Sequence, residues 1–253
     1  MPRPAPDVRG AIARAAAATG TDFSYLMAQA RLESGLNPQA RAVTSSASGL
    51  YQFTGQTWLS MLDKHGAQLG IAGASDPAAR AQLLALRSDP ELSALMAGQL
   101  ANDNRDFLTG ILGREPDASE LYLAHFLGAE GAGQFLGALS ANPGQSAAAL
   151  LPKAAAANRG VFFGPGGARS VGEVMDLLRG RMASAMNAPD GPLPANAAAA
   201  PQGGPIQQAF AAAATPHARS MADTLRDAFA LSQPGAAPAH VRAAYGQLRS
   251  LGI

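Results

Sequence analysis

The residues best suited to chemistry are a single glutamate and a small polar loop that follows it. Glu33 ends an apolar helical pattern, and the segment Gly49-Leu50-Tyr51-Gln52-Phe53 comes shortly after it. Cleavage of a glycosidic bond needs a proton on the leaving oxygen, which a carboxyl group delivers when it lies close to the bond and is partly shielded from water. A lone glutamate is most often a solvated residue, so the interpretation of Glu33 depends on its neighbours.

A short helix is predicted to carry Glu33 in its last turn. Asp22 is a suitable N-cap, and Gly35 lies where a left-handed C-cap is expected. Apolar residues between them recur at the spacing of one buried helix face. The dipole at the carboxyl end of a helix disfavours a charged carboxylate, which suits a residue that has to give up a proton.

The loop after this helix offers hydroxyls and an amide but no second acid. No Asp or Glu occurs from Ser34 through Leu62, and residues 42–49 read Ala-Val-Thr-Ser-Ser-Ala-Ser-Gly. Ordinary glycosidases pair two carboxylates, so one acid beside the Gln52 amide favours a mechanism in which the substrate supplies the second group. A serine-rich loop alone is more often a solvated turn. Asp103 and Asp106 are the best candidates if a second carboxylate takes part.

These motifs resemble the signature of the bacterial soluble lytic transglycosylases, which are lysozyme-like enzymes that cut peptidoglycan. The matching residues are Glu33-Ser34-Gly35-Leu36-Asn37-Pro38, Ala40 and Gly49-Leu50-Tyr51-Gln52-Phe53, and the resemblance covers about residues 8–140. It implies that Glu33 is the single catalytic acid and base. It also implies that Gln52 and the hydroxyls of Thr44, Ser45 and Ser46 contact the N-acetyl sugar.

The third motif of this family, Ala-Tyr-Asn-Ala-Gly, falls on Ala124-His125-Phe126-Leu127-Gly128, where the first alanine and the final glycine are kept. The tyrosine of the motif steadies the catalytic acid in the family. His125 holds its place here, and Tyr122 lies one helical turn earlier. His125 is equally compatible with a histidine at the edge of the core and with one that lines the groove. Both residues, together with Ser34 and Tyr51, are candidates for substrate binding.

Composition and patterning predict a mainly α protein. The chain has 253 residues, of which 47% are hydrophobic and only 6% aromatic, so small helices rich in alanine are favoured over a β-sandwich. No convincing alternation of β-branched residues predicts a strand. Helices are expected at about residues 7–18, 22–34, 54–66, 89–111, 118–127, 146–157 and 170–186. A short apolar run at 134–139 follows a glycine-rich turn, and residues 164–167 are expected to form another turn.

Three regions are predicted along the chain. Residues 1–186 form a lysozyme-like transglycosylase domain with a helical C-terminal extension, residues 187–216 an Ala/Pro-rich linker, and residues 217–253 a short helical tail of low complexity. The tail is either a docking hairpin for a protein partner or a segment that contacts the core weakly, because helices this short are marginal alone.

Several partner classes are disfavoured by the sequence. Four scattered histidines and no cysteine leave too few nitrogen and sulfur ligands for a metal site, so no metal and no cofactor are expected. A net charge of +1 argues against nucleic acid. Neither a signal-peptide core nor a membrane span is visible. We expect a monomer in the periplasm or cell envelope that arrives by an unidentified route: either the given sequence begins after processing, or the protein travels by another route.

The expected function is that of a peptidoglycan lytic transglycosylase. It would cleave the β-1,4 bond between N-acetylmuramic acid and N-acetylglucosamine, and the resemblance implies that it leaves 1,6-anhydro-muramoyl ends. One alternative is a muramidase on the same fold, in which water replaces the 6-hydroxyl of the sugar. The other is a non-catalytic peptidoglycan-binding or assembly protein. Peptidoglycan glycan strands are the expected partner in each case.

Overall fold

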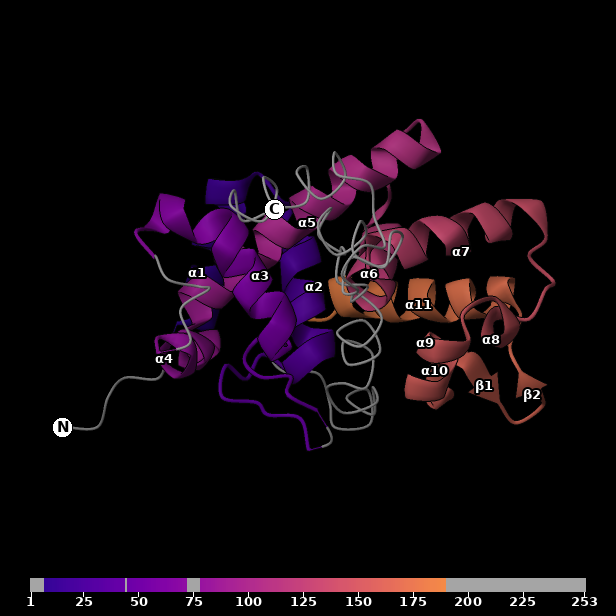
Figure 1. The fold of residues 1–253 in the computed structure, drawn as a ribbon. Coiled ribbons are helices and arrows are strands. Elements are labelled where there is room, and N and C mark those ends of the chain that lie inside the picture. Colours follow the sequence, from indigo (N-terminus) through magenta and orange to yellow (C-terminus); the bar gives the residue numbers. More distant parts are fainter. Residues whose placement is uncertain (1–6, 44, 72–77, 190–253) are drawn as a thin grey trace, which may run out of the picture. The chain divides into compact units, whose positions relative to one another are not determined.

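The computed structural model describes residues 7–43, 45–71 and 78–189, and this part of the chain is mainly helical (Figure 1). All of it belongs to the first of two compact units, Met1–Ala211. The second unit, Ala212–Ile253, lies outside the described residues. The linker and tail expected at 187–216 and 217–253 therefore lie outside them from residue 190 onward.

The first part of the described chain contains the helices that flank the polar loop. They are α1 (Val8–Thr19), α2 (Phe23–Ser34), α3 (Gly55–His65), η1 (Gly66–Leu69), α4 (Arg80–Ala85) and η2 (Leu86–Ser88). The predicted N-cap of α2 is confirmed, because the side chain of Asp22 accepts a hydrogen bond from the backbone N–H of Tyr25. Thr54 caps α3 in the same way, through the backbone N–H of Thr57. The predicted C-cap of α2 is also confirmed: Gly35 is left-handed, with φ 61°.

The second part is helical with one small hairpin. Its elements are α5 (Pro90–Leu112), α6 (Ala118–Leu127), α7 (Ala129–Ala141), α8 (Ala147–Leu150), α9 (Pro152–Ala157), α10 (Arg159–Phe162), β1 (Phe163–Gly164), β2 (Gly167–Ala168) and α11 (Val171–Met186). Strands β1 and β2 pair antiparallel, so the turn expected at 164–167 is confirmed. The helix expected at 170–186 is confirmed, and Ser170 and Glu173 form its capping box.

Two predictions of local structure were wrong. The single helix expected at 146–157 is divided into α8 and α9. Pro152 explains the division, because proline has no N–H to donate and disfavours a helical backbone at the residue before it. The apolar run at 134–139 is the middle of a longer helix, α7, which begins at Ala129 and includes the glycines that were expected to form a turn.

The alanine-rich composition appears in the way the helices pack. Helix α1 lies against α5, and buried alanines such as Ala11, Ala15, Ala94 and Ala97 allow the two backbones to approach closely. Gly98 marks the tightest point, since a Cβ atom there would lie 2.5 Å from Thr19 Oγ1. None of the described helices is long and apolar enough to cross a lipid bilayer.

Helix α11 is an integral part of the packed core. It contacts α2 and α6, the two helices that bring the candidate site together (Figure 1). Arg31 of α2 is buried and joins the two segments: its Nη1 donates to the Ala185 carbonyl at 3.0 Å and its Nη2 to the Pro189 carbonyl at 3.1 Å. The C-terminal extension expected from the sequence thus supports the helix that carries Glu33.

Candidate active site

Glu33 lies in the last turn of α2 and is partly shielded from solvent. Its side chain is 14% exposed. Two side chains of α6 reach the same carboxylate oxygen: Tyr122 Oη donates a hydrogen bond to Glu33 Oε1 at 3.5 Å, and His125 Nε2 lies 3.3 Å from that atom. The structure therefore brings together three predicted site residues that are far apart in the sequence.

The spacing of Tyr122 and His125 explains how both reach one carboxyl group. They lie three residues apart on α6, so they share a helix face. Their rings stack, with centroids 6.2 Å apart and planes inclined by 16°. His125 lies beside Glu33 together with Tyr122, which is one helical turn earlier. Contact of either residue with a sugar stays a prediction.

Two phenols near Glu33 are held in the protonated form. Burial raises the pKa of Tyr122 well above its usual range, and the negative charge of Glu33 raises it further. The pKa of Tyr25 of α2 is also raised, mainly by burial and secondly by the charge of Glu33. Tyr25 was not among the predicted site residues. Both hydroxyls remain hydrogen-bond donors over the physiological pH range.

Ser34 links the end of α2 to the polar loop. Its Oγ donates to the Leu50 carbonyl, 2.7 Å away, and lies 3.1 Å from the Ala30 carbonyl. The two sequence motifs, residues 33–38 and residues 49–53, are joined by this side chain. This hydrogen bond holds the loop at Leu50 against Ser34, the residue next to Glu33.

Gln52 and Tyr51 lie inside the protein. Gln52 adopts a left-handed backbone conformation, with φ 48°, and its Nε2 donates to the carbonyls of Gly49 at 2.8 Å and Ala40 at 3.2 Å. Tyr51 is fully buried and donates to the Leu26 carbonyl at 3.2 Å. Both side chains hold the loop in shape and against α2, and their predicted contact with a sugar stays untested.

The polar loop is held together by two isolated antiparallel bridges. One joins Arg41 to Ser48 and the other joins Ser48 to Phe53. Ser45 Oγ accepts a hydrogen bond from the Ala47 N–H, and Ser46 Oγ accepts one from the Gly55 N–H. Thr44 lies outside the described residues. These serine contacts shape the loop, and the predicted contact with an N-acetyl group is a further role.

Arg87 is a loop-stabilising residue that sequence reasoning missed. Its Nη1 donates to the carbonyls of Ser46 and Phe53, and its Nε donates to the carbonyl of Leu84. No residue motif indicates such bonds, because every acceptor is a backbone oxygen. The nearest signal is Gly49, which has φ 85° and whose Cβ, if present, would lie 2.0 Å from the Arg87 carbonyl oxygen.

The two candidates for a second acid are engaged elsewhere or exposed. Asp103 of α5 accepts from His65 Nε2 at 2.9 Å and from Lys64 Nζ at 2.8 Å, which ties α5 to α3. Asp106 is exposed on α5. Neither aspartate makes a recorded contact with Glu33 among the residues that the structure describes.

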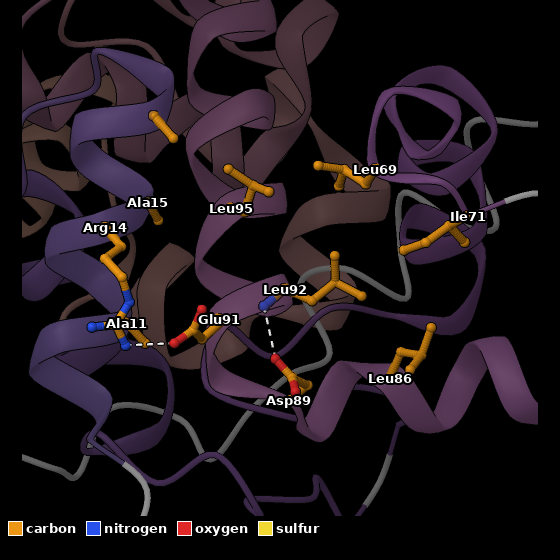
Figure 2. A pocket seen from close by; sticks show the side chains of 11 residues that line it. Ala11, Arg14, Ala15, Leu69, Ile71, Leu86, Asp89, Glu91, Leu92 and Leu95 are labelled. Atoms are coloured by element: carbon orange, nitrogen blue, oxygen red, sulfur yellow. Dashed lines mark hydrogen bonds and ion pairs between the residues drawn. The ribbon is translucent and has the colours of Figure 1, made fainter.

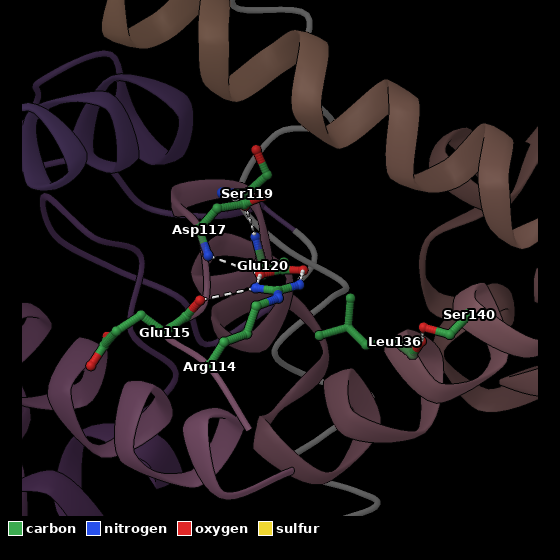
Figure 3. Close-up of polar contacts among 7 residues, drawn as sticks. All are labelled: Arg114, Glu115, Asp117, Ser119, Glu120, Leu136 and Ser140. Atoms are coloured by element: carbon green, nitrogen blue, oxygen red, sulfur yellow. Dashed lines mark hydrogen bonds and ion pairs between the residues drawn. The ribbon is translucent and has the colours of Figure 1, made fainter. Parts of the chain in front are cut away.

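A second shielded glutamate, Glu120, has very different surroundings (Figure 3). Its side chain is 4% exposed and accepts from Arg114 Nη1 and Nη2 at 2.8 and 2.7 Å, and from the Asp117 N–H at 2.8 Å. The hydrogen bond from Arg114 is the main cause that lowers the pKa of Glu120. Glu120 also completes the capping box with Asp117 that starts α6.

A separate cavity of about 400 Å³ lies between α1, η1 and the start of α5 (Figure 2). Leu69, Leu92 and Leu95 give it a mostly apolar lining, and Arg14 and Glu91 form an ion pair at its edge. None of the predicted site residues lines it. We assign it no role in the chemistry of Glu33.

No protein-family model matches this chain. The class that the structure defines is a mainly helical protein in which one partly shielded carboxyl group contacts a phenol and an imidazole. In the described part of the chain, no group of three or more His, Asp or Glu side chains is arranged to hold a metal ion. Proton transfer to or from Glu33 is the chemistry that this arrangement supports.

Proposed function

We propose that this protein is a peptidoglycan lytic transglycosylase with a lysozyme-like helical fold. The observation that carries the proposal is the position of Glu33, a partly shielded carboxyl group at a helix end that has Tyr122 and His125 on one oxygen. The family signature at residues 33–38 and 49–53 supports it, and Ser34 joins these two segments in space.

In the first step, protonated Glu33 gives its proton to the oxygen that links muramic acid to N-acetylglucosamine. The bond between that oxygen and C1 of the muramic acid breaks, and N-acetylglucosamine leaves with a hydroxyl group. The N-acetyl carbonyl oxygen of the muramic acid stabilises the positive centre at C1. The substrate thus supplies the group that a second carboxylate supplies in ordinary glycosidases.

In the second step, ionised Glu33 takes the proton from the 6-hydroxyl of the same muramic acid. The oxygen of that hydroxyl forms a bond to C1, which closes the 1,6-anhydro ring. Glu33 is protonated again and ready for the next cycle. No water is consumed, so one acid serves as general acid and then as general base.

Tyr122 and His125 orient the carboxyl group for these steps. Both side chains contact Oε1 of Glu33, so they orient the carboxyl group and leave its Oε2 atom for the proton transfer. Helix α11 packs on both α2 and α6, and therefore holds the two sides of this contact together.

The contact between His125 and Glu33 favours one alternative, a non-catalytic peptidoglycan-binding protein. His125 Nε2 lies 3.3 Å from Glu33 Oε1, so in this alternative the carboxyl group serves as a structural partner of His125 and not as an acid. In that case the protein would bind glycan strands without cutting them.

The proposal is tested by incubating the protein with purified insoluble peptidoglycan and separating pellet from supernatant. Soluble muropeptides that accumulate with time are the expected result, and heat-denatured protein is the control. Protein that sediments with the pellet without releasing fragments would favour the binding alternative. Protein that neither sediments nor releases fragments would contradict both.

A further inference from the structure

A polar cleft of about 440 Å³ lies beside the loop of the candidate site, between residues 41–42 and 45–48 of the loop, α4 and η2. Its polar lining consists of two arginines and four serines: Arg41, Arg87, Ser45, Ser46, Ser48 and Ser88. The cleft plays no part in the proton transfers proposed for Glu33. Its composition nevertheless points to a ligand of defined charge.

The charge of this cleft is positive and uncompensated by its own lining. Of the described residues that line it, none is an Asp or a Glu. Arg41 is exposed, and its charge adds to the effect of burial that lowers the pKa of Arg87. Two cations that repel one another, in a cleft that serine side chains also line, form a favourable place for an anion.

The guanidinium group of Arg87 is fixed in orientation before any ligand arrives. Its Nε and Nη1 atoms donate to three backbone carbonyls, one on α4 and two on the loop. Within the described residues, no acceptor is recorded for its Nη2 group, which remains for a ligand. A guanidinium group held in this way binds a carboxylate at little cost in side-chain entropy.

The cleft and the candidate active site share one loop. Ser48 lines the cleft, and two residues further along the chain the Leu50 carbonyl accepts from Ser34, the neighbour of Glu33. The loop thus connects the cleft to the helix end that carries Glu33, so a substituent on a sugar bound at Glu33 would have this loop as its neighbour. In peptidoglycan the muramic acid bears a peptide that carries free carboxylates.

We propose that this cleft binds a carboxylate of the peptide attached to muramic acid, and that it makes the enzyme prefer glycan strands that carry peptides. Arg41 and the Nη2 group of Arg87 are the charged donors, and the serine hydroxyls complete the site. This inference rests on the proposed function, because it names the part of the substrate that is recognised beside the bond to be cut.

The test compares glycan strands that keep their peptides with the same strands stripped of peptides by an amidase. Arg41→Gln removes one donor from the cleft, and its exposure makes the change harmless to folding. Arg80→Gln removes the same charge from exposed α4, next to the cleft but outside its lining, and is the matched control.

For the peptide-bearing strands, Arg41→Gln is expected to raise KM about five- to tenfold, as expected for the loss of one charge-assisted hydrogen bond, with kcat unchanged. The KM for stripped strands should stay the same, and Arg80→Gln should change neither value. The difference should shrink at high ionic strength, since salt screens exposed charges. An equal rise on both substrates, or none, would overturn the inference and leave the proposed function standing.

A second measurement separates failure of the cleft from failure of the catalytic proposal. If the protein cleaves neither substrate, titration calorimetry with a soluble disaccharide tetrapeptide and with inorganic phosphate tests the cleft directly. Tetrapeptide binding that is lost in Arg41→Gln and kept in Arg80→Gln supports the inference without any turnover. Binding of phosphate but not of tetrapeptide, or tetrapeptide binding that Arg41→Gln leaves unchanged, would overturn it.

Discussion

Glu33 and Glu120 are both largely shielded from solvent, yet the protein surrounds them in opposite ways. Glu120 accepts two hydrogen bonds from the guanidinium group of Arg114 and one from the backbone N–H of Asp117, with lengths of 2.7 to 2.8 Å. Glu33 has a phenol at 3.5 Å and an imidazole at 3.3 Å on one oxygen. Short charge-assisted bonds stabilise the ionised form of a carboxyl group, whereas long contacts to a phenol and an imidazole do so far less.

The hydrogen-bond donors around a shielded carboxyl group, more than its burial, therefore decide its role in the protein. The hydrogen bond from Arg114 lowers the pKa of Glu120, and its carboxylate fixes the first turn of α6. Among the described residues, Glu33 has neither a guanidinium group nor a backbone N–H as a donor, and its contacts come from a phenol and an imidazole. The two are also linked, because α6 begins at the capping box of Glu120 and carries Tyr122 and His125 to Glu33.

The largest expected effect is the loss of turnover in Glu33→Gln. An amide cannot deliver or accept the proton, and general acid–base catalysis contributes about 10²- to 10⁴-fold to a rate. We expect release of soluble muropeptides to fall by roughly 10³-fold while the thermal unfolding temperature stays close to that of the wild type. A variant that keeps its rate would contradict the contrast between the two glutamates.

Next in size is the destabilisation expected for Arg31→Met. This change removes the buried donors to the carbonyls of Ala185 and Pro189 and so weakens the contact of α11 with the Glu33 helix. We expect the free energy of unfolding to fall by about 2–4 kcal/mol, measured by chemical denaturation. Arg31→Lys, which keeps the charge, should lose less; equal losses would argue against the geometry of the guanidinium contact.

Glu120→Gln should lower stability without lowering the turnover of the folded protein. The loss of the charge-assisted bonds is expected to cost about 1–2 kcal/mol at neutral pH. Because the pKa of Glu120 lies below its ordinary 4.5 in the folded protein, its contribution is present above that pH and is lost as the pH falls through the folded-state value. Denaturation curves of variant and wild type should therefore converge in acid, and curves that stay parallel would exclude this explanation.

The smallest effect is expected for Tyr122→Phe. The change keeps the ring and its packing on His125 but removes the 3.5 Å hydrogen bond to Glu33. We expect kcat to fall by about threefold to tenfold, or about 1 kcal/mol, with KM nearly unchanged. Tyr25→Phe is the matched control, because Tyr25 feels the charge of Glu33 but makes no recorded hydrogen bond to it among the described residues. An equal loss in both variants would mean that Tyr122 acts only through packing.

The sequence predicted the features that depend on local rules. Asp22 and Gly35 have the cap positions expected of them, because a cap is decided by a few neighbouring residues. The mainly helical fold follows in the same way from apolar spacing. The helix expected at 146–157 was wrong because the helical pattern on both sides of Pro152 was given more weight than the proline itself. Pro152 divides this segment into α8 and α9.

The long-range contacts of the site could be predicted only in part. Resemblance indicated Glu33 and the region of Tyr122 and His125, which lie about 90 residues away in the sequence. Arg31 and Arg87 could not be found, because their partners are backbone carbonyls that every residue possesses. Which carbonyl lies near an arginine is decided by packing across the whole core.

The central claim is that Glu33 alone carries out both proton transfers, so that the sugar closes on itself and water does not enter the product. The most direct test is digestion of purified peptidoglycan by the wild-type protein in water labelled with oxygen-18, followed by mass spectrometry of the new muramoyl ends. The account predicts anhydro ends without label. Hydrated ends that carry the label would contradict it and identify a muramidase.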